Sequence, residues 1–239
     1  PPDVTCPTCN KLGERVFDRL TIIAGRRFGK TFYGSLAAVE EACIPNTIGW
    51  AAAPTNQKLN RYVIPAFQKL IAPEWVKNWS TEYNDLLLKN NSLIHFQTLE
   101  DPDQGRGHGL DLLWIDEVCE LTQRHWEVIR PSLAGPGVAF FTTTPRGYDW
   151  VYEELFSPAE KGFPGYWGCH APSSQSANPR LSADFLARER EQMSDTMYRQ
   201  EYEADFVTFT GAVYGDLITP QVINEPAQIL TMIPEWPAI

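Results

Sequence analysis

Ala24-Gly25-Arg26-Arg27-Phe28-Gly29-Lys30-Thr31 is the stretch that decides the fold, and it directly follows an apolar run at residues 20–23. A strand, a glycine-rich turn and a helix in this order surround phosphate groups with backbone N–H groups, while a lysine and a hydroxyl bind phosphate and Mg²⁺. Gly29, Lys30 and Thr31 fill the last three places of that pattern. The first glycine comes one place late, at Gly25, so a plain glycine turn with a surface lysine remains an alternative for this stretch alone.

A second apolar run, residues 112–115, ends in Asp116 and Glu117. It predicts a buried strand that places two carboxylates at its carboxyl end, the edge at which the phosphate loop must also lie. In ATPases with such a loop, an aspartate there binds Mg²⁺, and a glutamate can activate the attacking water. A solvated acidic turn explains one Asp-Glu pair equally well, but it does not explain the pair together with the loop.

Two further apolar runs end in polar residues, which is the same arrangement again. Residues 47–53 stop at Pro54-Thr55, and residues 137–141 lead into a run of threonines that could contact a γ-phosphate. Strands that alternate with helical segments predict an open, mostly parallel sheet flanked by helices. We expect helices at residues 31–43 and 122–130, a linker at 172–179, and one long helix that begins after Ser182 and extends to Tyr202.

In their order along the chain, these motifs resemble the large terminase subunit of tailed bacteriophages, the ATPase that packages double-stranded DNA into a preformed capsid. The resemblance covers roughly residues 20–215, and it implies an α/β P-loop NTPase fold of the ASCE/RecA-like class with a small C-terminal helical lid subdomain. It rests on the GRRFGKT-like loop, Ala53-Pro54-Thr55, Gly105-Arg106-Gly107, the strand that ends in Asp116-Glu117, Thr143-Thr144-Pro145 and Tyr198-Arg199-Gln200-Glu201-Tyr202.

The resemblance also implies roles for individual residues. Lys30 would bind the β- and γ-phosphates, Thr31 and Asp116 would hold Mg²⁺, and Glu117 would be the catalytic carboxylate. Arg26 resembles an arginine that acts within its own subunit. Arg106 resembles one that reaches a neighbouring subunit's site, although a surface arginine in a glycine-rich loop is the alternative. The remaining implied residues are Ala24, Gly25, Arg27, Phe28 and Gly29 for nucleotide binding, and Thr143, Thr144 and Pro145 for coupling.

The implied cofactors are ATP and Mg²⁺. The implied partners are double-stranded DNA, other copies of this chain in a homo-oligomeric ring, the portal protein and the small terminase subunit, but no membrane. The implied location is the host cytoplasm, docked at the procapsid portal during packaging. We expect a lead-in at residues 1–19, an ATPase core at 20–171, and a linker and lid at 172–239. Family members continue into an RNase H-like nuclease, so we expect no nuclease activity from a chain that ends at Ile239.

Composition limits these expectations. With 239 residues and 43% apolar content, the chain can bury one good-sized core plus a small subdomain, and it has no apolar run near the ~18 residues of a membrane span. A net charge of −10 repels the phosphate backbone of DNA, so we expect DNA contacts to be confined to local positive regions or shared between subunits. Lys58, Arg61, Arg124 and Arg146 are candidates. Five cysteines, an odd number, argue against a disulfide framework.

The sequence leaves some assignments open. Cys6 and Cys9 form half of a zinc motif without an evident second half. The resemblance implies a glutamine upstream of the loop that reads adenine, but the first glutamine here, Gln57, comes after the loop, so adenine recognition has no candidate. A helicase-like nucleic-acid translocase is the alternative function, and a nucleotide-dependent switch is a third that Glu117 disfavours. Asn10-Lys11 is not followed by the aspartate of a guanine signature, which argues against a GTPase.

Overall fold

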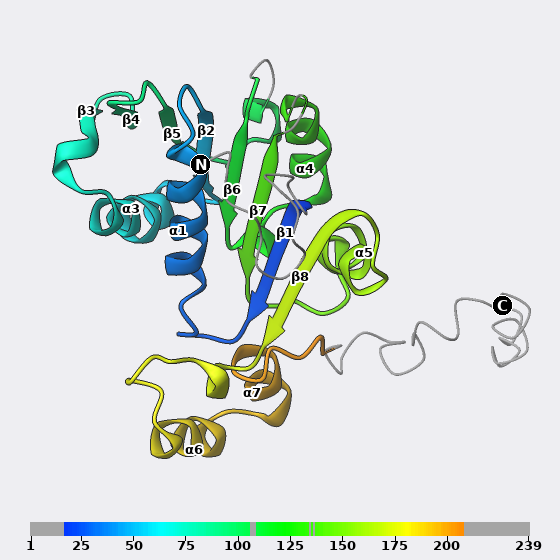
Figure 1. Cartoon of the computed structure of the whole chain (residues 1–239). Helices are drawn as coiled ribbons and strands as arrows, with labels where there is room; N and C mark the ends of the chain where they lie inside the picture. Colours follow the sequence, from blue (N-terminus) through cyan, green and yellow to red (C-terminus); the bar gives the residue numbers. More distant parts are fainter. Residues whose placement is uncertain (1–16, 106–108, 134, 136, 208–239) are drawn as a thin grey trace, which may run out of the picture.

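The computed structural model describes residues 17–105, 109–133, 135 and 137–207. They form an eight-stranded sheet in the order β3-β4-β5-β2-β6-β7-β1-β8 (Figure 1). Six neighbouring strands of this sheet are mutually parallel: β5, β2, β6, β7, β1 and β8. Strands β3 and β4 extend the sheet beyond β5 as an antiparallel hairpin. The strands are β1 (Phe17–Ala24), β2 (Ile48–Ala53), β3 (Val76–Ser80), β4 (Asp85–Leu88), β5 (Leu93–Thr98), β6 (Leu112–Asp116), β7 (Val138–Thr143) and β8 (Gly165–Ala171).

Helices cover both faces of this sheet. Figure 1 shows α1 and α3 on one side and α4 and α5 on the other, with α6 and α7 below the carboxyl ends of the central strands. The helices are α1 (Lys30–Ala42), α2 (Asn56–Lys58), α3 (Ile64–Leu70), α4 (Gln123–Ile129), α5 (Ser157–Glu160), α6 (Ala183–Gln192) and α7 (Asp195–Glu201). Across the described part of the chain, no helix has both the length and the apolar character of a membrane span.

The alternation of β2 shows why the central strands are apolar on both faces. Ala51 and Ala53 pack with α1 and α3, whereas Trp50 and Ala52 pack with α4 on the opposite side. Successive side chains of a strand point to opposite faces, so a strand covered on both sides must be apolar along its whole length. The parallel-sheet interpretation of the four apolar runs is therefore confirmed, as are the helices expected at residues 31–43 and 122–130.

The single long helix expected after Ser182 is wrong, because the chain forms α6 and α7 with a break between them. Met193 is extended, with φ −111° and ψ 156°. The Ser194 side chain accepts a hydrogen bond from the backbone N–H of Met197 and begins a new helix. A serine side chain can accept a hydrogen bond from a nearby backbone N–H and so compete with continuation of the helix. The spacing of apolar residues, on which the expectation rested, does not report this competition.

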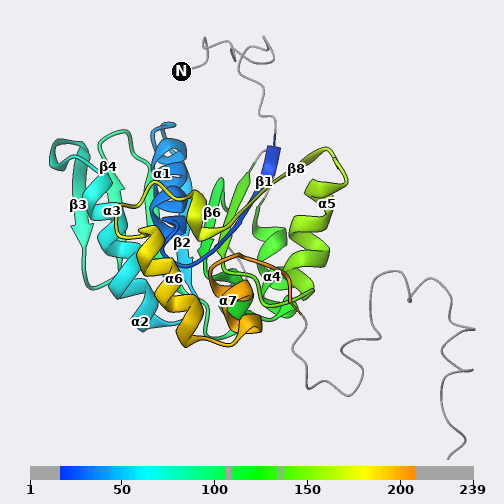
Figure 2. The same cartoon turned by 90° about the horizontal axis from the view of Figure 1, so that it is seen from below.

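The α6–α7 unit lies across the carboxyl edge of the sheet, as the view from below shows (Figure 2). The chain reaches it through residues 172–179, which the sequence suggested were a linker. Within this segment Ser173 is completely buried, whereas Ser174, Gln175, Ala177 and Pro179 are exposed. The phosphate loop contacts α7 directly, because the N–H of Arg26 donates to the carbonyl of Glu201 at 2.6 Å, and residues of both line one cleft.

Candidate active site

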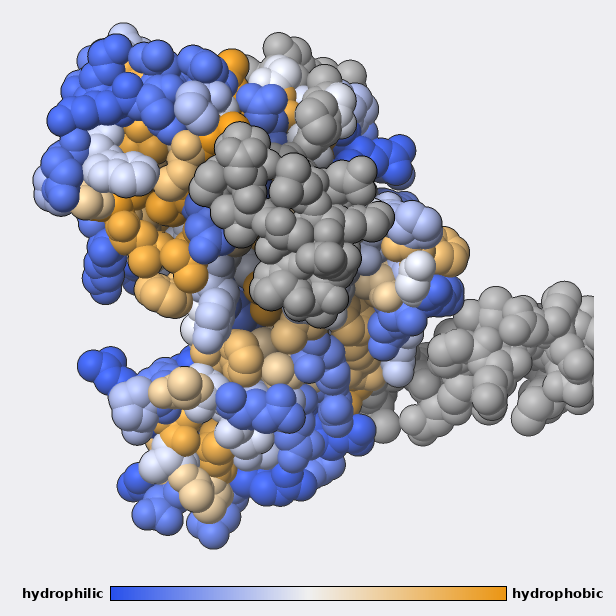
Figure 3. Space-filling view, viewed as in Figure 1, coloured by the Kyte–Doolittle hydropathy of each residue, from blue (hydrophilic) through white to orange (hydrophobic). Residues whose placement is uncertain are grey.

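The site lies where three neighbouring strands end. β1, β6 and β7 are adjacent and parallel, and their register pairs Asp116 with Thr142 and Ile23 with Thr143. The loop at residues 25–29, the acidic pair and the threonine run are thus brought to one edge. An open cleft of about 1010 Å³ lies between this edge and the α6–α7 unit, and the molecule is visibly hollowed there in Figure 3.

The loop at residues 25–29 has backbone features of a phosphate-binding loop. Arg27 and Gly29 adopt positive φ angles of 60° and 109°, and α1 begins immediately afterwards at Lys30. The first N–H groups of a helix have no partner within it, and they favour anions. Gly29, Lys30 and Thr31 all line the cleft, so the helix N-terminus is available to a bound phosphate.

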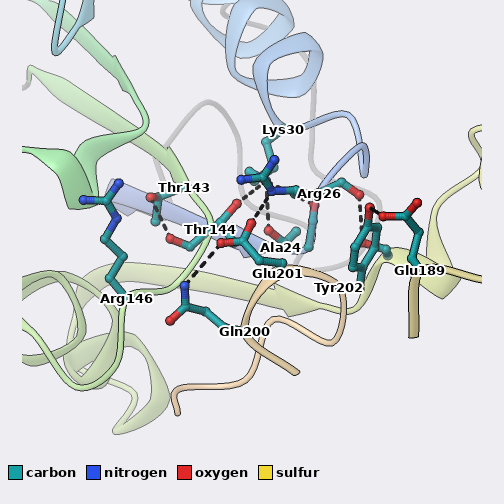
Figure 4. Close-up of polar contacts among 12 residues, drawn as sticks. Ala24, Arg26, Lys30, Thr143, Thr144, Arg146, Glu189, Gln200, Glu201 and Tyr202 are labelled. Carbon is teal, nitrogen blue, oxygen red and sulfur yellow. Dashed lines mark hydrogen bonds and ion pairs between the residues drawn. The ribbon is translucent and has the colours of Figure 1, made fainter. Parts of the chain in front are cut away.

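Lys30 joins the loop to the end of β7. Its Nζ donates hydrogen bonds to the carbonyls of Ala24 at 2.9 Å and Gly25 at 3.1 Å, and to Thr144 Oγ1 at 2.9 Å (Figure 4). Burial lowers the pKa of Lys30, and the carboxylates of Glu117 and Asp116 oppose that shift. The ammonium group is therefore largely removed from water and lies among carbonyl and hydroxyl oxygens.

Asp116 is held by two hydroxyl groups and is only 5% exposed. Thr31 Oγ1 donates to its Oδ2 at 2.8 Å, and Thr142 Oγ1 donates to its Oδ1 at 2.6 Å. Thr142 in turn accepts from Trp114 Nε1 at 3.1 Å. Burial raises the pKa of Asp116, whereas the two hydroxyl bonds and Lys30 lower it. A cation at this carboxylate would favour its charged form.

The oxygens of Thr31 and Asp116 fit Mg²⁺. Neighbouring octahedral ligands about 2.1 Å from Mg²⁺ lie about 3 Å apart, and these two oxygens are 2.8 Å apart. Within the described residues, no group of three or more His, Cys, Asp or Glu side chains could hold a metal ion. Two protein oxygens with the other positions left to phosphate and water is the usual arrangement for Mg²⁺ at nucleotide sites.

Glu117 shares this cleft because of an unusual backbone conformation. Its φ of 53° and ψ of 46° are left-handed, a conformation that costs a non-glycine residue about 1–2 kcal/mol. Neighbouring side chains of a strand would otherwise point to opposite faces, yet Asp116 and Glu117 both line the cleft. Burial raises the pKa of Glu117, and the Lys30 ammonium opposes that shift.

The structure places the remaining predicted residues as follows. Arg26 forms an ion pair with Glu201 of α7, and this hydrogen bond raises the pKa of Arg26 (Figure 4). Arg106 lies outside the described residues. Thr143 Oγ1 donates to the carbonyl of Thr144 at 3.1 Å. It also accepts from the backbone N–H of Cys119 at 3.4 Å. Of the two threonines, Thr144 is the one that contacts Lys30. Ala24 ends β1, Gly25 and Phe28 belong to the loop itself, and Pro145 and Arg27 line the cleft.

Sequence reasoning missed several residues of this site. Thr142 belongs to the threonine run expected at a γ-phosphate, but its bond to Asp116 was not predicted, although pairing the strands at 112–116 and 138–143 places the two residues opposite each other. An ion-pair cluster was not evident: Lys58 and Arg146, both DNA-contact candidates, pair with Glu120 at the cleft. Both cations share this one carboxylate, so Glu120 offsets only part of their positive charge. Of the other two candidates, Arg124 forms an exposed pair of 3.4 Å with Asp103, and Arg61 is exposed.

Comparisons with known proteins agree with this geometry. The large terminase subunit of Escherichia phage T5 is 27% identical over 205 residues, covering 82% of this chain and 45% of the relative. That of Thermus virus P23-45 is 28% identical over 228 residues, covering 81% of this chain and 47% of the relative. The chain therefore spans about half the length of the curated relatives it matches.

Solved structures of large terminases share the fold. The ATPase domain of the Thermus phage P74-26 large terminase superposes with a TM-score of 0.60 at 23% identity, covering 82% of this chain and 91% of that one. The large terminase of a thermophilic bacteriophage, solved in complex with ADP, superposes with a TM-score of 0.69 at 18% identity, covering 80% of this chain and 49% of that one.

A family model also matches most of the chain. The model described as "Terminase large subunit, T4likevirus-type, N-terminal" matches residues 21–216, which include every strand and helix of the described structure except the first residues of β1. With the phosphate loop, the acidic pair and the threonine run at one sheet edge, this match settles the family. The chain belongs to the terminase large subunits of T4likevirus type, as their N-terminal region.

Proposed function

We propose that this chain is an ATP-hydrolysing motor domain that drives double-stranded DNA into the procapsid. The main support is the 2.8 Å hydrogen bond between Thr31 and Asp116, which are 85 positions apart in the sequence. These two residues line the same cleft as Lys30 and Glu117. One cleft thus holds a lysine that could bind phosphate, two oxygens that fit Mg²⁺, and a second carboxylate that could act on water. The large terminase of the thermophilic bacteriophage was solved with ADP, which supports adenine nucleotide as the ligand of this chain.

Each residue would act through the chemistry of its side chain. Lys30 would turn its ammonium from the loop carbonyls to the β- and γ-phosphates, whose charge would favour its protonated form. Thr31 and Asp116 would hold Mg²⁺, which when bound neutralises phosphate charge. Glu117, with its pKa raised by burial, would accept a proton from the attacking water. Thr144 would link the state of Lys30 to the end of β7.

Assembly would complete the site. Arg26 would act within its own subunit, and Arg106 would reach the site of the neighbour in a homo-oligomeric ring. The portal protein and the small terminase subunit would be further partners in the host cytoplasm. A net charge of −10 fits DNA contacts that are shared among subunits better than a single basic face. We expect no nuclease activity from these 239 residues.

Two substitutions test the site. Glu117→Gln should keep nucleotide binding and lower turnover about 10²- to 10⁴-fold, the usual contribution of a general base. Lys30→Ala should lose affinity for a fluorescent ADP analogue. Glu127→Gln and Lys77→Ala are matched controls on exposed residues of α4 and β3. Turnover equal to wild type in Glu117→Gln, or unchanged affinity in Lys30→Ala, would refute these assignments.

Mixing experiments test the contribution of a neighbour. Arg106→Ala and Glu117→Ala subunits should each be inactive, and a mixture should regain hydrolysis because some interfaces combine an intact arginine with an intact glutamate. An assembling mixture without recovery contradicts the role of Arg106. Separation of the strands of a short duplex would instead favour the helicase-like alternative, since packaging moves the double strand intact.

A further inference from the structure

The outer side of the phosphate loop is held by three side chains from one short segment. The carbonyls of the consecutive residues 26, 27 and 28 accept hydrogen bonds from Ser173 Oγ at 2.7 Å, Asn178 Nδ2 at 2.9 Å and Ser176 Oγ at 2.8 Å, respectively. The loop and the segment are separated by about 150 residues of chain. We call Ser173, Ser176 and Asn178 the loop clamp.

The clamp side chains are themselves fixed by further bonds. Ser176 Oγ accepts from the backbone N–H of Asn178 at 3.1 Å, and Asn178 Oδ1 accepts from that of Arg180 at 3.0 Å. The N–H of Ser173 donates to the carbonyl of Tyr202 at 2.7 Å. Since Asn178 uses its oxygen and its nitrogen on different partners, the orientation of its amide is determined.

The clamp also explains the displaced glycine of the loop. A Cβ atom at Gly25 would lie 2.2 Å from Ser173 Oγ and 2.6 Å from the carbonyl oxygen of Tyr202. Both distances are far below van der Waals contact, and the second atom belongs to backbone. Glycine at this position is therefore required by the approach of the segment, whatever the loop binds on its other side.

Fixing three carbonyls also fixes N–H groups. In a planar trans peptide, the C=O of one residue and the N–H of the next point in opposite directions. With the carbonyls of residues 26 and 28 bonded outward to the clamp, the N–H groups of Arg27 and Gly29 point away from it. Both residues line the cleft, and N–H groups turned to one side attract an anion. The N–H of Phe28, between them, donates instead to the carbonyl of Gly25 at 3.3 Å.

We propose that Ser173, Ser176 and Asn178 are positioning residues of the phosphate site, so that the affinity for nucleotide phosphates depends on the docking of the 173–178 segment. The inference rests on the proposed nucleotide function of the loop. Linkage requires the converse as well: a bound nucleotide strengthens the docking of this segment by the same factor. The segment is thus a working part of the site and not only a connection to α6.

Single substitutions within the segment test the clamp. Ser176→Ala and Asn178→Ala should each weaken binding of a fluorescent ADP analogue with Mg²⁺ about fivefold, the equivalent of one net hydrogen bond, and the double variant about 20- to 30-fold. Ser176→Thr keeps the hydroxyl and should bind as wild type does. Ser174→Ala makes the same change at an exposed neighbour that does not contact the loop, and it should have no effect.

The readouts separate the possible results. Kd is measured on folded protein, with the melting temperature recorded without nucleotide, because a purely structural role would lower the melting temperature and leave Kd unchanged. Clamp variants that bind as tightly as Ser174→Ala refute the clamp. If wild-type protein itself binds no adenine nucleotide, the proposed function fails instead. Hydrogen exchange on wild type needs no variant: ADP should slow exchange at residues 173–178, and unchanged exchange during saturated binding contradicts the inference.

Discussion

Replacing Thr142 with valine should separate the chemical role of its hydroxyl from its packing. The hydroxyl donates to Asp116 Oδ1 at 2.6 Å and accepts from Trp114 Nε1 at 3.1 Å, and all three residues are buried. Valine keeps the shape and removes both bonds. Trp114 would then have a buried donor without this partner, and Asp116 would lose one of its two hydroxyl donors.

The expected cost follows from those two losses. A buried unsatisfied donor costs about 1–3 kcal/mol and a lost bond to a charged group about 1.5–3 kcal/mol, so the variant should lose about 3 kcal/mol of unfolding free energy at pH 8. For a domain of this size, that lowers the melting temperature by about 6–12 °C. Thr142→Ser, which keeps the hydroxyl and loses a methyl group, should cost only about 1 kcal/mol.

The effect should also depend on pH. Burial raises the pKa of Asp116, so the carboxyl takes up a proton in the folded state at a higher pH than in the unfolded chain. A bond to a neutral acceptor is weaker than one to a carboxylate, so the loss in Thr142→Val should be smaller at pH 5 than at pH 8. Urea unfolding followed by the fluorescence of the eight tryptophans measures both values. A valine variant no less stable than the serine variant at pH 8 refutes the reasoning.

Three further predictions concern the fold and the site. A Cβ atom at Gly34 would lie 2.2 Å from Trp114 Nε1, so Gly34→Ala should lose about 1–3 kcal/mol in urea unfolding, and an unchanged midpoint would contradict this packing. Burial raises the pKa of Cys119 to about 12, so at pH 8 iodoacetamide should label exposed Cys43 and spare Cys119 in peptide mass spectra; rapid labelling of Cys119 would count against its burial. Thr31→Ala should require more Mg²⁺ for half-maximal nucleotide binding, whereas Thr31→Ser should match wild type, and equal requirements in all three proteins would remove Thr31 as a ligand.

The central strands could be predicted from the sequence because burial on both faces leaves an unbroken apolar run that ends in polar residues. The edge strands could not. β8 is partly exposed along most of its length and contains two glycines, and β3 has only partly buried or exposed residues. Such strands take their place from their neighbours, so local composition carries little information about them.

Four residues of the candidate site were predictable, since Asp116 and Glu117 stand at the end of β6, and Lys30 and Thr31 begin the helix that follows β1. A parallel sheet must bring the carboxyl ends of these strands to one edge. The residues that support the loop from outside were not. Ser173 and Asn178 stand in a run of Ser, Gln, Asn and Pro that is typical of loops, and only the tertiary structure shows their bonds to the phosphate loop. Glu201 is likewise 175 residues from Arg26, its ion-pair partner.

A crystal structure with Mn²⁺ and a non-hydrolysable ATP analogue tests the central claim most directly. Mn²⁺ replaces Mg²⁺ at oxygen ligands, and its anomalous scattering locates it independently of the protein atoms. The account predicts an anomalous peak beside Thr31 Oγ1 and the carboxylate of Asp116, with the phosphates along residues 25–31. A nucleotide bound elsewhere, or a metal ion out of reach of both Thr31 and Asp116, would contradict it.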